Sequence, residues 1–242
     1  MAHVSAPYRI NEIARRVSAH SYLEIGVQAG KTFFNVDIPL KVAVDPNFLF
    51  DHKEYASSEA IFYNCTSDDF FSSVDSSPKF DIVFLDGLHT FDQTYRDFCN
   101  ALIYTHERSI IIIDDTVPND YYSSLRSQSS CVLRRKREAP GSTIEEWRGD
   151  VYKVILLLTL FHSSMGFITS TDDGPGQTIV WRKNSYPNLP QICPSTINQD
   201  RYQLLFEYLN RLPLIDFDWF LDNKSMINSV AFDSFIRLLD EI

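Results

Sequence analysis

The sequence has few cysteines, and those few stand far apart. Cys65, Cys99, Cys131 and Cys193 form no C-x-x-C pair, so a zinc knuckle is not expected. Four scattered thiols in a chain of 242 residues also do not form the pattern of a disulfide-rich secreted domain. We therefore expect free, mostly buried cysteines in a reducing compartment, which indicates a cytoplasmic protein.

Basic residues and long apolar runs are also scarce. The chain has 22 Lys and Arg against 32 Asp and Glu, a formal net charge of −10. A nucleic-acid-binding face is not expected, since neutralising phosphates requires clustered basic side chains. The longest apolar run, Val154 to Phe161 apart from Thr159, is too short to cross a bilayer, and the N-terminus lacks the apolar stretch of a signal peptide. We expect neither a nucleic acid nor a membrane as a partner.

Short apolar runs alternate with helical patterns through most of the chain. Such runs are typical of strands buried on both faces of a parallel sheet, and the patterns between them are those of crossover helices. Strands are predicted over 22–25, 41–44, 60–63, 80–85 and 109–113, with a hairpin of 167–170 and 178–182. Helices are predicted over 8–20, 90–106 and 147–165. The sequence therefore predicts a doubly wound α/β sheet with helices on both faces and C-terminal helices.

Two segments fall outside this repeating pattern. Residues 116–146 are polar and lack periodicity, which predicts a mobile lid loop. The basic run Arg134–Arg137 within it is either a solvated part of the loop or a source of positive charge for an anionic ligand. Residues 185–242 form a helical extension to a domain of residues 1–184, and Phe232, Phe235, Ile236 and Leu239 make one apolar stripe there. We interpret the extension as a cap on the core or a dimer surface.

The first predicted strand ends in Glu24-Ile25-Gly26-Val27-Gln28-Ala29-Gly30. Gly26 permits a tight turn and Gly30 lets the backbone lie close to a ligand, while the helix expected next would present free N–H groups. The spacing E-x-G-x-x-x-G differs from the dinucleotide motif G-x-G-x-x-G, because Gln28 takes the place of its second glycine. Taken alone, the motif also fits a plain strand–turn–helix without a ligand.

Polar side chains follow the next two strands as well. Asp45 ends the second strand, where a carboxylate can accept hydrogen bonds from both hydroxyls of a ribose. Ser67 and Asp68 follow the third strand in a small polar segment that suits an adenine edge. The alternative for Asp68 is a cap at the start of a helix. All three tips belong to the carboxyl edge of the predicted sheet, so we expect one ligand-binding crevice there.

With these tips in register, the chain resembles the class I methyltransferases that depend on S-adenosylmethionine (SAM), over about residues 20–183. The resemblance implies a mostly parallel Rossmann-like sheet in which the terminal hairpin supplies an antiparallel strand. It also implies SAM as the cofactor. By this resemblance, the SAM-binding residues are Glu24, Gly26 and Gly30 at the methionine part, Asp45 at the ribose, and Ser67 and Asp68 near the adenine. Gln28 departs from the family pattern, which often has a glycine at that place.

Acidic side chains end the fourth and fifth strands. Asp86 follows one strand, and Asp114 and Asp115 follow the other. Neighbouring tips would bring three carboxylates together, where a divalent cation such as Mg²⁺ would relieve their repulsion. This part resembles the metal-dependent small-molecule and sugar O-methyltransferases, which have acids at these places. Alternatively, Asp86 caps the following helix and the acid pair shapes a loop.

His89 lies three residues after Asp86, where the catechol-type relatives have a lysine that takes the hydroxyl proton. We therefore take His89 and Asp86 as the catalytic residues, with His89 as the base. The resulting hypothesis is methyl transfer from SAM to a hydroxyl of a small molecule, a sugar or a phenol, assisted by a divalent metal. The alternatives are a metal-free N-, C- or O-methyltransferase and a SAM-binding protein without catalysis. Whether the chain forms a homodimer is left open.

Overall fold

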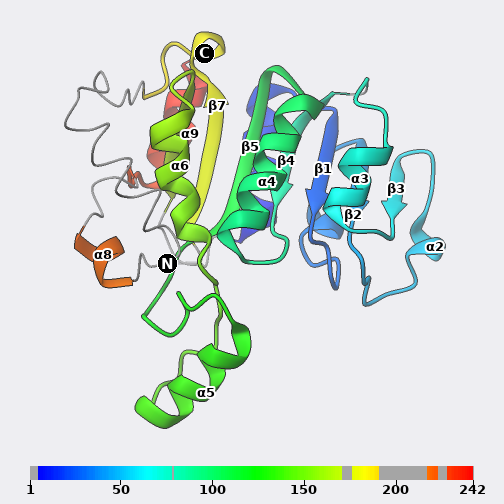
Figure 1. Cartoon of the computed structure of the whole chain (residues 1–242). Helices are drawn as coiled ribbons and strands as arrows, with labels where there is room; N and C mark the ends of the chain where they lie inside the picture. The colour runs from blue at the N-terminus through cyan, green and yellow to red at the C-terminus, as the bar shows by residue number, and fades with distance from the viewer. Residues whose placement is uncertain (1–4, 78, 171–175, 191–216, 223–227, 242) are drawn as a thin grey trace.

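Seven strands form the sheet at the centre of the protein (Figure 1). This computed structural model describes residues 5–77, 79–170, 176–190, 217–222 and 228–241. The strands are β1 (Ser21–Ile25), β2 (Leu40–Val44), β3 (Ala60–Tyr63), β4 (Phe80–Leu85), β5 (Thr105–Val117), β6 (Met165–Ser170) and β7 (Gly176–Arg182). Their order is β3-β2-β1-β4-β5-β7-β6. The pairs among β1 to β5 are parallel, and β7 runs antiparallel to β5 and β6, which confirms the predicted hairpin strand.

Helices cover both faces of the sheet, so the predicted doubly wound α/β class is confirmed. In Figure 1, α3 (Ser67–Ser73), α4 (Phe91–Ala101) and α6 (Val154–Phe161) lie in front of the sheet, and α1 (Ala6–Val17) and α9 (Phe232–Asp240) lie behind it. Successive side chains of a strand point to opposite faces. Ile111 of β5 therefore joins the core under α4 and α6, whereas Ile112 joins the core under α1 and α9. No helix among the described residues is long and apolar enough to cross a bilayer.

The C-terminal helix α9 completes the rear core. Its buried side chains are Phe232, Phe235, Ile236 and Leu239, as their spacing predicted. Phe235 stacks on Trp181 of β7 with ring centroids 5.7 Å apart, and Asp240 forms an ion pair of 2.7 Å with Arg16 of α1. This part of the extension is therefore a cap on the core. Other parts of the predicted extension, notably residues 191–216, and the predicted hairpin turn at 172–175 lie outside the described residues.

The predicted helix after Gly30 is wrong. The chain forms only one 3₁₀ turn, η1 (Phe33–Asn35), between β1 and β2. The turn before it is irregular, with positive φ at Gly26, Gln28 and Gly30, and η1 ends before Val36, whose φ of −86° and ψ of 124° are extended. Instead, Phe33 is buried against the rear face of the sheet. The crossover therefore offers no long helix whose N-terminus could face a ligand.

Two other helices are shorter than predicted. α4 ends at Ala101 and is followed by the 3₁₀ turn η2 (Leu102–Tyr104), because the carbonyl of Leu102 accepts hydrogen bonds from Thr105 and Arg182 at 3.0 and 3.2 Å. Such side-chain bonds satisfy a carbonyl at a helix end. The helix predicted over 147–165 begins only after a turn at Gly149, whose φ is 64°, and the 3₁₀ turn η3 (Val151–Lys153). The remaining short elements are α2 (His52–Tyr55), α8 (Phe217–Asp222) and η4 (Lys183–Ser185).

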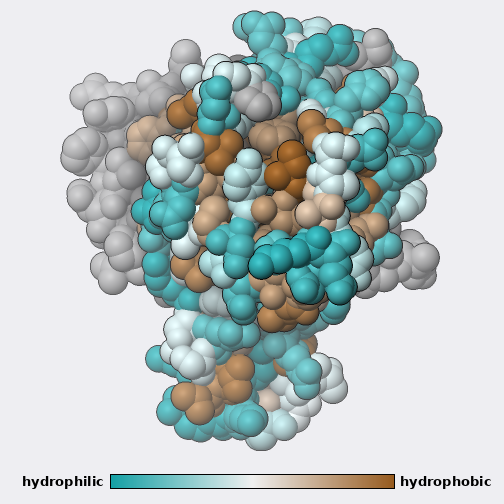
Figure 2. Space-filling view, turned by 90° about the vertical axis from the view of Figure 1, so that its right-hand side faces the viewer, coloured by the Kyte–Doolittle hydropathy of each residue, from teal (hydrophilic) through white to brown (hydrophobic). Residues whose placement is uncertain are grey.

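The segment predicted as a lid loop contains a helix, α5 (Gln128–Glu138). Figure 1 shows α5 apart from the body of the protein, below the sheet, and Figure 2 shows hydrophobic side chains on this projection. Val132 and Leu133 are exposed there. Within the basic run, Arg135 is buried and pairs with Asp120 at 2.9 Å, so it stabilises the projection itself. Periodicity did not reveal α5, because its buried face contains an arginine. Whether the projection moves stays a prediction.

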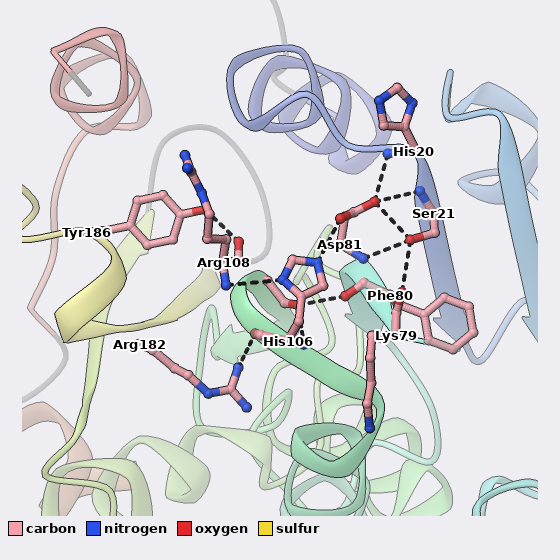
Figure 3. Close-up of polar contacts among 10 residues, drawn as sticks. His20, Ser21, Lys79, Phe80, Asp81, His106, Arg108, Arg182 and Tyr186 are labelled. Carbon is pink, nitrogen blue, oxygen red and sulfur yellow. Dashed lines mark hydrogen bonds and ion pairs between the residues drawn. The ribbon is translucent and has the colours of Figure 1, made fainter. Parts of the chain in front are cut away.

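A polar network stabilises the amino edge of the sheet, opposite the carboxyl ends of the parallel strands (Figure 3). The carboxylate of Asp81 accepts hydrogen bonds from the backbone N–H groups of His20 and Ser21 at 2.8 and 2.9 Å. Its other oxygen lies 2.8 Å from Nε2 of His106. Burial alone would raise the pKa of Asp81, but these hydrogen bonds together hold it below its usual value. Asp81 thus links the starts of β1, β4 and β5.

Candidate active site

A cavity of about 920 Å³ runs along the carboxyl edge of the sheet. Ligand sites of open α/β sheets form at this edge, where the crossover connections leave a crevice. The predicted residues that line the cavity are Glu24, Gly26, Asp45, Ser67, Asp68, Asp86, His89, Asp114 and Asp115. Gly30 was predicted with them but is not part of the lining. The structure thus brings nearly all of the predicted residues to one hollow.

Asp45 holds the turn that follows β1. Its Oδ2 accepts hydrogen bonds from the N–H groups of Val27 and Gln28, both at 2.8 Å, and its Oδ1 accepts one from Asn47 at 2.7 Å. A carboxylate has about four acceptor sites, so three of them are already used. The remaining site on Oδ1 suffices for one ribose hydroxyl, not for the bidentate contact that the sequence suggested.

The two glycines of the motif are required by packing. A Cβ on Gly26 would lie 1.9 Å from the carbonyl oxygen of Asp86, and its φ of 87° is unfavourable for other residues. A Cβ on Gly30 would lie 2.4 Å from the ring of Phe34. Gly26 therefore lets the tips of β1 and β4 touch beneath the cavity, while Gly30 serves the turn outside it.

Glu24 is buried at the cavity wall. Its Oε2 accepts a hydrogen bond of 2.7 Å from the hydroxyl of Tyr22. Burial raises the pKa of Glu24 well above its usual value, and this hydrogen bond offsets the rise only in part. Burial at the cavity wall thus shifts Glu24 toward its neutral form.

Ser67 and Asp68 open α3 at one end of the cavity. The cap of this helix is Thr66, whose hydroxyl accepts from the N–H of Asp69 at 3.1 Å, so Asp68 does not serve as the cap. Asp68 instead pairs with Arg96 of α4 at 2.9 Å. Beside it lies Asp97, also in the lining, whose pKa burial raises to about 6. Sequence reasoning missed Asp97, although it is an acid next to an apolar position of a predicted helix.

His89 lies between two carboxylates at the other end of the cavity. Its Nε2 is 3.2 Å from Oδ1 of Asp86, and its Nδ1 is 3.1 Å from Oδ2 of Asp115. Burial lowers the pKa of His89, but the bond to Asp86 and the charge of Asp115 outweigh it and raise the pKa to about 9. The pKa of Asp86 rises to about 6, because withdrawal from water outweighs the contact with His89. At neutral pH the pair is thus an imidazolium beside a carboxylate.

Asp114 stands apart from this cluster. The described acid and imidazole groups whose ligand atoms lie within 4.8 Å of one another are those of Asp86, His89 and Asp115. Asp114 accepts a hydrogen bond of 2.9 Å from the N–H of Asp115. Its pKa is raised well above the usual value, first by burial and then by the charges of Asp86 and Asp115. The predicted trio of Asp86, Asp114 and Asp115 therefore does not meet around one point.

Two residues that the sequence did not place in the predicted site complete this end. Trp147 stacks on the imidazole of His89 with ring centroids 5.1 Å apart. Arg148 reaches Asp115, with its Nη1 at 2.6 Å from Oδ1. Both side chains line the cavity. The available signal was Trp147 itself, an aromatic residue directly after a long polar segment.

Residues 23–116 match a protein-family model described as a methyltransferase domain. The match begins in β1 and includes the strand tips that carry Asp45, Asp86 and Asp115. Over these residues, which make up less than half of the chain, it is similar to methyltransferase domains. No sequence among the curated proteins matches this chain.

Several solved structures are similar to this chain. Cofactor-bound Rv0187 from MTB matches it with a TM-score of 0.51 and 13% identity, over 75% of this chain and 82% of that one. The O-methyltransferase TomG from Streptomyces achromogenes, in complex with SAM, has a TM-score of 0.49 and 17% identity, over 74% of this chain and 81% of that one. An O-methyltransferase from Bacillus cereus in complex with SAH has a TM-score of 0.47 and 14% identity, over 75% of this chain and 84% of that one. At 13% identity, the likeness to Rv0187 concerns the fold alone.

Proposed function

We propose that this methyltransferase transfers the methyl group of SAM to a hydroxyl of a small molecule. The observation that carries the proposal is one cavity with two chemically different ends. One end has the β1 turn, Asp45 and Ser67, which suit a nucleoside. The other end has His89 between two carboxylates, which suits an acceptor that must lose a proton. SAM would place its sulfonium between these ends, with Glu24 and Gly26 along the methionine part.

The reaction is a single displacement. A lone pair of the acceptor oxygen attacks the methyl carbon, the bond between sulfur and methyl breaks, and its electron pair stays on sulfur to form S-adenosylhomocysteine. The cavity walls hold the two reactants in line, which removes much of the entropic cost of their encounter. The acceptor proton passes to His89 in its neutral form, and Asp86 stabilises the resulting imidazolium.

The sequence hypothesis also includes a divalent metal, and none of the reaction steps above involves it. The close group of Asp86, His89 and Asp115 has ligand atoms of the right type. However, Asp115 already pairs with a buried arginine at 2.6 Å, and a divalent ion beside that guanidinium would be repelled. The residues as arranged therefore do not fit an ion. Mg²⁺, a cytoplasmic location and a homodimer stay predictions of the sequence.

Calorimetry with SAM and S-adenosylhomocysteine tests the proposal first. Both should bind, and Asp45→Asn should weaken both, whereas Asp37→Asn, an exposed acid outside the cavity, should not. A screen of hydroxyl and amine acceptors for the mass gain of one methyl then tests the reaction. If SAM does not bind, the proposed function is wrong. If only amines are methylated, the transfer to a hydroxyl is wrong.

A further inference from the structure

The cavity already contains a cation from the chain itself, in contact with Asp115. The ion pair between Arg148 and Asp115 has a length of 2.6 Å, and the two side chains are only 11% and 5% exposed. A buried guanidinium is costly unless it is paired. Its pairing partner here is one of the acids that the sequence suggested for a metal. The other oxygen of Asp115, Oδ2, lies 3.1 Å from Nδ1 of His89, so both oxygens of this carboxylate already face a basic group.

Arg148 is held in this place by its neighbours on the chain. Its N–H donates to the carbonyl of Ser123 at 2.9 Å. Gly149 packs so closely on the carbonyl of His89 that a Cβ would lie 1.7 Å from that oxygen. Asp150 accepts a hydrogen bond of 3.0 Å from the first N–H of α4, that of Phe91. The loop that carries Arg148 is therefore clamped to the loop that carries His89, and the guanidinium is part of the folded site.

Basic side chains already contact both carboxylates of the close cluster. Asp86 lies 3.2 Å from Nε2 of His89, and Asp115 lies 3.1 Å from Nδ1 of His89 and 2.6 Å from Nη1 of Arg148. The repulsion among carboxylates that would call for a divalent ion is thus already relieved.

We propose that Arg148 takes the place of a divalent cation in this methyltransferase and binds the acceptor oxygen. Among the described residues, the buried Nε–H of Arg148 has no hydrogen-bond partner, and the side chain lines the cavity. A planar guanidinium that is anchored on Asp115 through Nη1 can donate its remaining N–H groups to an oxygen that gains negative charge as its proton leaves. The acceptor class is therefore one with an acidic hydroxyl or a neighbouring anionic oxygen. This inference rests on the proposed function.

Titration of the full chain with Mn²⁺ tests the inference without an acceptor. The parent protein should bind Mn²⁺ at this site at least about tenfold more weakly than Arg148→Met, in which the carboxylate of Asp115 is released. Arg148→Lys should remain as weak as the parent, because it keeps the charge. Arg126→Met is the matched control, since Arg126 is an exposed arginine of the same region outside the cavity lining. Binding of SAM to each variant, measured in parallel, reports on the proposed function separately.

Two results can overturn the inference, and the one with EDTA needs no variant. Mn²⁺ binding by the parent that is tight and is abolished by Asp115→Asn would show that the site takes an ion despite Arg148. With an active acceptor, the parent should retain full turnover in EDTA, and Arg148→Met should lose about 10²-fold in kcat and regain part of it with Mn²⁺. Loss of parent activity in EDTA would also overturn the inference, whereas absent SAM binding would instead refute the proposed function.

Discussion

The Nε2 atom of His89 lies 3.2 Å from Oδ1 of Asp86, three residues earlier in the chain. Both side chains are partly exposed to the cavity, at 24% and 30%. His89 adopts a left-handed backbone conformation with a φ of 53°, which is uncommon for a residue with a side chain. The turn after β4 thus directs the imidazole back toward the carboxylate that ends the strand. This contact raises the pKa of His89 and so affects the protonation of the site.

Methyl transfer should depend on pH through His89. The pKa of His89 is raised to about 9, so the neutral base is scarce at pH 7 and its share increases with pH. We expect the rate to rise by nearly tenfold per pH unit above pH 7 and to level off near pH 9. Asp86→Asn should move this midpoint to lower pH, because it removes a partner that stabilises the imidazolium. NMR titration of the His89 ring measures the same pKa without an acceptor, and a value below 7 in the free protein would contradict the prediction.

Removing the base should lower turnover and leave the affinity for SAM unchanged. His89→Ala should lower kcat by about 10²–10⁴-fold, the usual contribution of a general base. The affinity for SAM, measured by calorimetry, should stay within about twofold, because His89 lies at the acceptor end of the cavity. His162→Ala is the matched control, since that histidine bonds to Tyr95 outside the cavity lining. Equal turnover of the parent and His89→Ala would remove His89 from the mechanism.

Asp45 should stabilise the turn after β1 even when no ligand is bound. Asp45→Asn replaces a carboxylate that accepts three backbone hydrogen bonds, and an amide has only one oxygen to accept them. We expect the free energy of unfolding to fall by about 1–3 kcal/mol. Hydrogen exchange at the amides of Val27 and Gln28 should accelerate in the variant. Unchanged protection of both amides would mean that the turn holds without Asp45.

Glycine should be indispensable at position 26 and dispensable at position 141. Gly26→Ala would place a Cβ 1.9 Å from the carbonyl oxygen of Asp86 at a φ of 87°, and we expect a loss of stability on the order of 1–3 kcal/mol or more. Gly141→Ala has nothing within 4 Å of the added Cβ and should cost almost nothing. Thermal unfolding of the two variants provides the comparison. A similar Tm for both would contradict the close contact between the tips of β1 and β4.

The free energy of unfolding should depend on pH through Asp81. The pKa of Asp81 is lowered in the folded protein, so its contribution is complete above about pH 4, the pKa of an unfolded aspartate, and is lost as the pH falls through the folded value. Asp81→Asn should therefore lower the free energy of unfolding at pH 7 by about 1–2 kcal/mol. The difference from the parent should shrink below pH 4. A difference that does not change with pH would mean that the carboxylate charge is irrelevant.

The strands and the residues at their tips were predictable because both depend on short stretches of sequence. A run such as Ile110–Ile113 has no alternation, so it predicts a strand that is buried on both faces. Once the strands are parallel, Asp45 and Asp86 must meet at one edge. The missing helix after Gly30 was less predictable, since the aromatic packing of Phe33 and the backbone of Gln28 depend on the surrounding fold.

The sequence by itself determined the α/β class, the edge at which the site forms and the acidic residues at the strand tips that line it, since strand periodicity and residue order are local properties. The tertiary structure alone decided how the charges at that edge are paired. Arg148 stands 33 positions after Asp115 in the chain, and no pattern in the sequence connects them. Their contact exists because Gly149 and Asp150 clamp one loop to another. Electrostatic energies depend on distance in space, so the choice between an added metal and an arginine of the chain is made only in the folded protein.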